Sequence, residues 1–120
     1  MKKIKFYTAH RKDDEIYFKP AEGYLTIIMS SSGNQFNIAI HKLSSGWWGA
    51  TDIQSGISVS PHGSRKTKKE IMCDIEEECF ADKIEKAISC CKYYDECVNK
   101  IKELIEQEQN FVAHLFTQGR

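Results

Sequence analysis

The stretch that decides the fold is PHGSRKTKKE, residues 61–70, because the composition of the chain changes there. Before it, short segments alternate apolar and polar residues between turn residues, a pattern typical of β-strands. After it there is no proline, and no glycine between Gly63 and Gly119, which favours helices. Thr67 and Glu70 have the spacing of a capping box, so we expect the first helix to begin there.

Upstream of this boundary, six segments have the alternation expected of strands. Pro20 and Gly23 are expected to turn the chain between the second and the third. The short connections favour antiparallel neighbours. The polar residues Thr26, Asn37 and His41 fit a sheet with one solvated face. The predicted strands cover residues 3–8, 15–19, 24–30, 36–40, 47–53 and 57–60.

Downstream, apolar residues recur every three or four positions in two stretches. The break between them is expected near residues 92–95, and a shorter interruption at 79–82 remains open. The sequence therefore predicts a single α+β domain spanning residues 1–120. In it, an antiparallel meander of five or six strands (about residues 3–60) is packed by two C-terminal helices, about 67–91 and 95–110.

Length and composition restrict the classes of protein that need to be considered. The chain has 120 residues, of which 41% are hydrophobic and 28% charged, as in an ordinary globular domain. The N-terminal residues lack the apolar stretch of a secretory signal, and no apolar run is long enough to span a bilayer. We expect a cytoplasmic protein without membrane association and without a cofactor.

The five cysteines fall within residues 73–97. Their odd number, without an export signal, argues against a disulfide framework. No C-x-x-C knuckle is present and the four histidines are scattered, so no metal site is predicted. Partly buried, inert thiols are the main expectation, and a cysteine-dependent or metal-linked activity is the alternative.

The net charge of zero divides into two halves of opposite sign. Residues 1–66 hold nine basic and five acidic side chains, and the rest hold eight basic and twelve acidic ones. The halves therefore carry +4 and −4. Glu76, Glu77 and Glu78 are expected to form an anionic helix face that attracts a basic protein surface, or simply a solvated face.

The start of the first predicted helix breaks a local rule, because cations gather where the helix dipole prefers anions. Free N–H groups, hydroxyls and cations together are typical of a phosphate or carboxylate site. We therefore take this cluster as a candidate anion or nucleic-acid site, the alternative being side chains that extend into solvent. Its residues are Ser64, Arg65, Lys66, Thr67, Lys68 and Lys69.

Trp47 and Trp48 are adjacent in a predicted strand, so they cannot both face the core. An exposed tryptophan between Gly46 and Gly49 would suit a protein interface. Catalysis has little support: His62 could approach Asp52, but no nucleophile elbow, paired-carboxylate motif or H-E-x-x-H is present. We expect a protein that is not an enzyme.

Two short stretches carry a resemblance: WGATDIQSGISV, residues 48–59, and KTKKEI, residues 66–71. Together they resemble the strand–turn–strand–capped-helix unit of small phage and mobile-element proteins, among which are anti-CRISPR proteins. The resemblance implies a phage- or prophage-type inhibitor that docks on a host protein or nucleoprotein complex. The alternative is a small nucleic-acid or phosphate-ligand binding module that uses the basic cluster.

Overall fold

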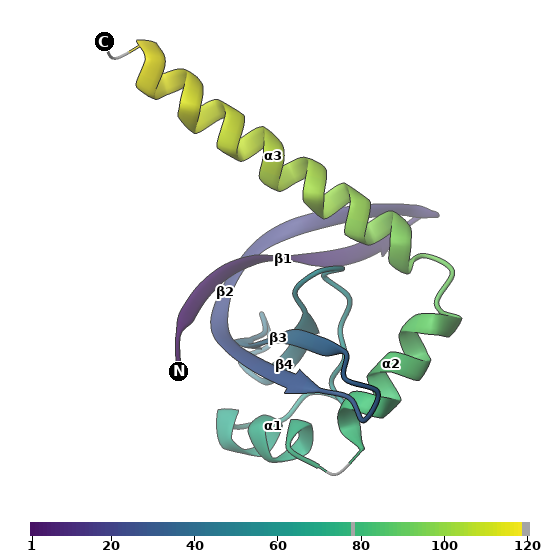
Figure 1. Cartoon of the computed structure of the whole chain (residues 1–120). Coiled ribbons are helices and arrows are strands. Elements are labelled where there is room, and N and C mark those ends of the chain that lie inside the picture. The colour runs from purple at the N-terminus through teal and green to yellow at the C-terminus, as the bar shows by residue number, and fades with distance from the viewer. Residues whose placement is uncertain (78, 119–120) are drawn as a thin grey trace.

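The computed structural model describes residues 1–77 and 79–118, with side chains described as far as Glu108. Within these residues an antiparallel sheet of four strands is followed by three helices, so the predicted α+β class is confirmed (Figure 1). Strand order in the sheet follows the chain. The elements are β1 (Lys3–Lys12), β2 (Glu15–Met29), β3 (Gln35–Lys42), β4 (Trp48–Asp52), α1 (Lys68–Ile75), α2 (Phe80–Cys90) and α3 (Tyr94–Gln118).

The prediction of five or six strands is wrong, first because two predicted strands are one. β2 continues through Pro20, where the sequence predicts a turn. At Pro20 the strand pairs with β1 but not yet with β3, which joins at Tyr24, so the missing proline N–H costs no bond to β3. At Gly23 a Cβ atom would lie 2.5 Å from the carbonyl oxygen of Ile40. Glycine therefore permits a close approach to β3 while β1 and β2 curve together (Figure 1).

The last predicted strand, residues 57–60, is an irregular segment that lies along β4. The Asp52 N–H donates to the Ile57 carbonyl at 2.9 Å, and the Val59 N–H donates to the Ala50 carbonyl at 2.9 Å. On the other side, the Ala9 N–H in β1 donates to the Gly56 carbonyl at 2.8 Å. The segment after β4 thus bonds to both edge strands, which curls the sheet back on itself.

The core lies between one face of the sheet and the helices α1 and α2. Ile38 and Ile40 of β3 and Ile71 of α1 are completely buried. Phe80 and Ile84 of α2 belong to the same cluster. β3, α1 and α2 thereby bury the apolar faces that their sequence patterns provide, whereas Ile27 and Met29 of β2 are exposed.

The prediction of two helices is also wrong, because the stretch 67–91 forms both α1 and α2. α1 ends at Ile75, where the acidic side chains of Glu76 and Glu77 oppose the helix dipole. Cys79 then has a left-handed φ of 69°, which an uninterrupted right-handed helix cannot contain. The interruption that the sequence left open at 79–82 therefore separates the two helices.

The face of the sheet that does not contact α1 and α2 is less exposed to solvent than the polar residues Thr26, Asn37 and His41 predict. Thr26 pairs with Ile38 and so lies on the core face. His41 is only 5% exposed, because the Phe6 ring packs against it with centroids 5.0 Å apart. Its Nε2 lies 2.7 Å from Thr51 Oγ1. Burial lowers the pKa of His41, so the packing of β1 over this side chain favours its neutral form.

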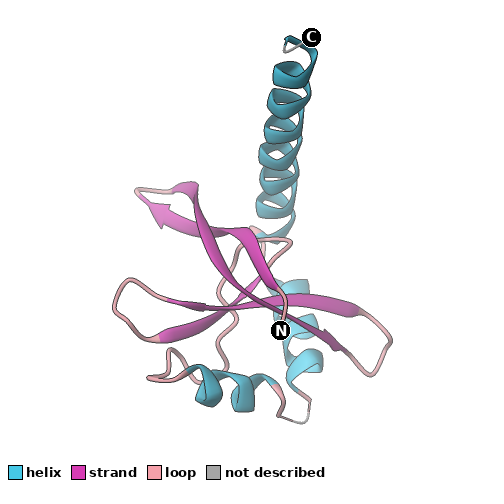
Figure 2. Ribbon diagram, turned by 90° about the vertical axis from the view of Figure 1, so that its left-hand side faces the viewer, coloured by secondary structure: helices cyan, strands magenta, loops and turns pink. Residues whose placement is uncertain are grey.

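α3 starts on the body and then leaves it, as Figure 2 shows. Cys97 and Ile101 are buried near its N-terminal end. The Tyr7 hydroxyl donates to Glu108 at 3.4 Å, close to where the helix passes the sheet. The predicted end near residue 110 is wrong, since the helix continues to Gln118. None of the described helices combines the length and apolar character needed to cross a bilayer.

Candidate binding surface

The tight turn between β3 and β4 exposes one tryptophan and buries much of the other. The Leu43 N–H donates to the Trp47 carbonyl at 2.7 Å, and Gly46 adopts a φ of 89° within this turn. Trp48 packs against the core cluster, whereas Trp47 is 42% exposed. The prediction that the two tryptophans do not share the core is confirmed.

The segment before α1 brings the predicted basic cluster to this turn. Trp48 and Arg65 exchange two backbone hydrogen bonds, with N···O distances of 2.6 and 2.9 Å. This pairing places the ammonium group of Lys66 5.9 Å from the centroid of the Trp47 ring. Such an arrangement is a cation–π contact.

A second cation–π contact lies beside the first, because α1 begins two residues after Lys66. The Lys68 ammonium lies 3.6 Å from the centroid of the Tyr24 ring. We call Tyr24, Trp47, Lys66 and Lys68 the lysine–aromatic surface. It joins residues from β2, from the turn before β4 and from the start of α1.

Arg65 is turned away from this surface. Its Nε lies 2.8 Å from Asp74 Oδ2 and its Nη2 lies 3.1 Å from Asp74 Oδ1, a bidentate ion pair. Hydrogen bonding to Asp74 and the charge of that carboxylate raise the pKa of Arg65. Asp74 is only 5% exposed, so Arg65 holds the loop against α1 and is not free to bind an anion.

The N-terminus of α1 is capped by its own side chains. The Glu70 N–H donates to Thr67 Oγ1 at 3.2 Å, which confirms the predicted cap. The Glu70 carboxylate accepts from the Thr67 hydroxyl at 3.0 Å instead of from a backbone N–H. Ser64 and Lys69 are exposed. Because a carboxylate already lies at this helix end, the geometry gives little support to a phosphate site there, and that site stays a prediction.

Two of the acidic candidates, Glu76 and Glu77, lie at the other end of α1, about 12 Å away for a helix of this length. Glu76 is exposed. The Glu77 carboxylate is in contact with His62. The Nε2 atom of His62 lies 2.9 and 3.1 Å from the two carboxylate oxygens of Glu77. Glu78 lies outside the described residues. The structure therefore brings Trp47 together with Lys66, whereas Glu76 and Glu77 lie at the far end of α1.

Among the described residues, one group has the spacing of metal ligands: His62, Asp74 and Glu77, whose candidate atoms lie within 4.8 Å of one another. The bidentate contact with Arg65 already compensates Asp74, which disfavours a cation there. The five cysteines are free thiols, and the expectation of partly buried thiols is wrong for three of them, because Cys73, Cys79 and Cys90 are exposed. Burial raises the pKa of the Cys97 thiol, as expected for an inert core cysteine.

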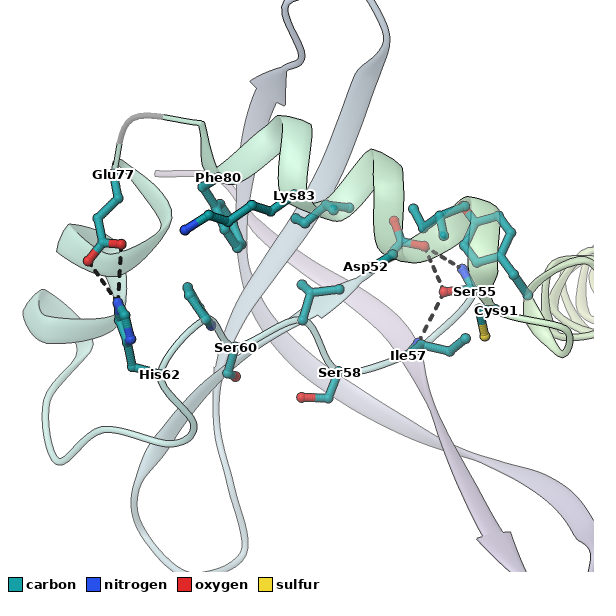
Figure 3. A pocket seen from close by; sticks show the side chains of 16 residues that line it. Asp52, Ser55, Ile57, Ser58, Ser60, His62, Glu77, Phe80, Lys83 and Cys91 are labelled. Carbon is teal, nitrogen blue, oxygen red and sulfur yellow. Dashed lines mark hydrogen bonds and ion pairs between the residues drawn. The ribbon is translucent and has the colours of Figure 1, made fainter.

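A cleft of about 440 Å³ runs between residues 57–62 and α2, and sequence reasoning missed it (Figure 3). The pair that the sequence singled out, Asp52 and His62, lines the cleft at opposite ends (Figure 3). Asp52 and Ser55 form a local turn that the sequence spacing could have indicated. The position of α2, which forms the other wall, is not encoded in any local motif.

Comparisons with known proteins return nothing for this chain: no protein-family model, no curated protein and no solved structure matches it.

Proposed function

We propose that this chain is a non-enzymatic binding protein that docks through the lysine–aromatic surface on an acidic protein surface of a larger complex. The observation that carries the proposal is the exposure of Trp47 beside Lys66 and Lys68. Tryptophan is enriched among the residues that dominate binding energy, and lysines around it favour an acidic partner.

The arrangement of the cations supports a protein partner over a phosphate ligand. Lys66 and Lys68 each lie over a different aromatic ring, Trp47 and Tyr24 respectively. Arg65, the side chain best suited to bidentate phosphate binding, is paired with Asp74. Nucleic acid is therefore the second candidate partner.

The kind of complex follows from the resemblance to small phage and mobile-element proteins. We propose an inhibitor of phage or prophage type, directed at a host defence complex such as a CRISPR nucleoprotein. A small protein with an exposed anchor and opposite charges on its two halves suits occlusion of a partner's surface.

The test compares two exposed aromatic–lysine pairs of the same chain. Tagged protein is used to capture partners from nuclease-treated host lysate, and the affinity of the captured partner is then measured with purified components. Trp47→Ala combined with Lys66→Glu should weaken binding by about 30-fold or more, because an anchor contributes about 2 kcal/mol.

The control variant is Tyr17→Ala combined with Lys19→Glu. Tyr17 is 40% exposed, and the Lys19 ammonium lies 5.7 Å from its ring centroid, which closely matches Trp47 and Lys66. The control should bind within about threefold of the unmodified protein. Equal binding by both double variants would refute the proposal, and capture that disappears after nuclease treatment would favour the nucleic-acid alternative.

A further inference from the structure

The last residues of β2 pair with another strand on one side only, among the residues that the structure describes. β1 pairs with residues 15–24 of β2, and its bonding to β2 ends where the Leu25 N–H donates to the Lys2 carbonyl at 2.9 Å. Residues 26–29 continue to pair with β3 on the other side. An unpaired strand edge presents N–H and C=O groups with which another strand can pair.

The backbone groups of Ile27 and Met29 are the ones that face this edge. In an antiparallel sheet, successive residues of a strand direct their N–H and C=O groups to opposite sides. Leu25 bonds toward β1, whereas the Ser30 N–H donates to Asn34 in the hairpin with β3. Ile27 and Met29 share the direction of Leu25. Within the described part of the chain, no backbone hydrogen bond reaches either residue from that side.

The side chains of this edge are apolar and exposed. Ile27 is 56% exposed and Met29 is 63% exposed. Thr26 and Ile28 point to the core face instead, because side chains alternate along a strand. Native edges are usually protected by a lysine, a proline or a bulge, and residues 26–29 contain none of these. The edge therefore has the properties of a pairing site.

Two copies of this edge are complementary to each other. In an antiparallel pair centred on Ile28, Ile27 of each copy lies opposite Met29 of the other. Both residues direct their backbone groups outward, so each such pair can exchange both of its N–H···O bonds. On the exposed face, each apolar side chain then covers an apolar side chain of the second copy, the kind of cross-strand contact that stabilises sheets.

The charges beside the edge are complementary as well. The turn after β2 is held against α2 (Figure 1): the Ser31 N–H donates to Asp82 at 2.7 Å, and the Ser32 hydroxyl donates to Glu85 at 2.8 Å. In the pairing centred on Ile28, this acidic turn of one copy comes next to Lys2 of the other, which is exposed. Opposite charges at the border of an interface help to fix its register.

We propose that two copies of this chain associate through residues 26–29 of β2, in an antiparallel pairing that joins their sheets edge to edge. The interface is isologous, because each copy contributes the same edge. Few residues pair, so the dimer should dissociate on dilution. The proposal is independent of the proposed function, since residues 26–29 do not belong to the lysine–aromatic surface.

The first test measures association and its location in the unmodified protein. Sedimentation velocity over a series of concentrations should show a monomer that becomes a dimer as the concentration rises. Amide hydrogen exchange of Ile27 and Met29 should be about tenfold or more slower at high concentration than at low, because their N–H groups become bonded. The amide of Leu25, already bonded to Lys2, is the internal control and should change by less than about twofold.

Two double variants test the register. Ile27→Lys with Met29→Lys places lysine opposite lysine in both cross-strand pairs and should weaken the dimer by about tenfold or more. Ile27→Glu with Met29→Lys places glutamate opposite lysine, so its dimer should be at least about tenfold tighter than that of the first variant. Tyr17→Lys adds a lysine to β2 outside this edge and should associate within about threefold of the unmodified protein.

Three outcomes would overturn the proposal. A monomer at every concentration would leave this edge to an extended segment of another protein. A dimer that is unchanged in Ile27→Lys with Met29→Lys would place the interface elsewhere on the chain. Equal weakening in the two double variants would exclude the register in which Ile27 lies opposite Met29. Circular dichroism checks that each variant is folded, and the exchange measurement needs no variant.

Discussion

Helix α1 begins with Lys68 and Lys69 and is followed by Glu76 and Glu77, charges that the helix dipole disfavours at each end, although Glu70 in the first turn follows the rule. The two ends differ in what surrounds these charges. At the C-terminal end, Glu77 is in contact with His62. At the N-terminal end, Lys66 and Lys68 lie over exposed or half-buried aromatic rings instead of over carboxylates. Local rules tend to be broken at functional sites, so the end that combines lysines with an exposed tryptophan is the one we assign to binding.

The largest change in stability at either end of α1 is expected from loss of the cap. Thr67→Ala removes the acceptor for the Glu70 N–H and should lower the free energy of unfolding by about 1 kcal/mol. Urea denaturation measures this difference. Ser64→Ala, an exposed neighbour, is the control and should change the free energy by less than about 0.5 kcal/mol. Equal effects of the two variants would mean that the cap does not hold this end of the helix.

A smaller change in the free energy of unfolding is expected when the charges that oppose the helix dipole are reversed. The change should have the same sign at both ends of α1. Lys69→Glu and Glu76→Lys each replace a charge that opposes the dipole, so each should raise the free energy of unfolding by about 0.5 kcal/mol at low salt. The gain should shrink in high salt because these side chains are exposed. A loss of stability at either end would show that its charge serves the fold and is not kept for binding.

The sequence was sufficient for features set by neighbouring residues. The cap at Thr67, the alternation that buries Ile38 and Ile40, and the separation of the two tryptophans all follow from local spacing. The sequence was insufficient where distant segments meet. The sequence around Pro20 predicts a turn. β2 nevertheless accommodates this proline, because β3 begins to pair with β2 only at Tyr24.

The functional features divide in the same way. The basic cluster is visible in the sequence, but its contacts with Tyr24 and Trp47 depend on the pairing of Arg65 with Trp48, which is a long-range register. The cleft also depends on the direction that α2 takes after the left-handed residue Cys79, which local sequence does not specify. Neither the lysine–aromatic surface nor the cleft produces a periodic pattern in the sequence, because each joins residues from different elements.

The most direct test of the binding surface reverses its charge and reads stability and binding from the same preparation. In the variant Lys66→Glu with Lys68→Glu, the free energy of unfolding should stay within about 1 kcal/mol of the unmodified protein, since lost cation–π contacts and improved dipole interactions offset each other. Capture of the partner from nuclease-treated lysate should fall by at least about tenfold. A folded double variant that captures its partner as well as the unmodified protein does would contradict the assignment of this surface to binding.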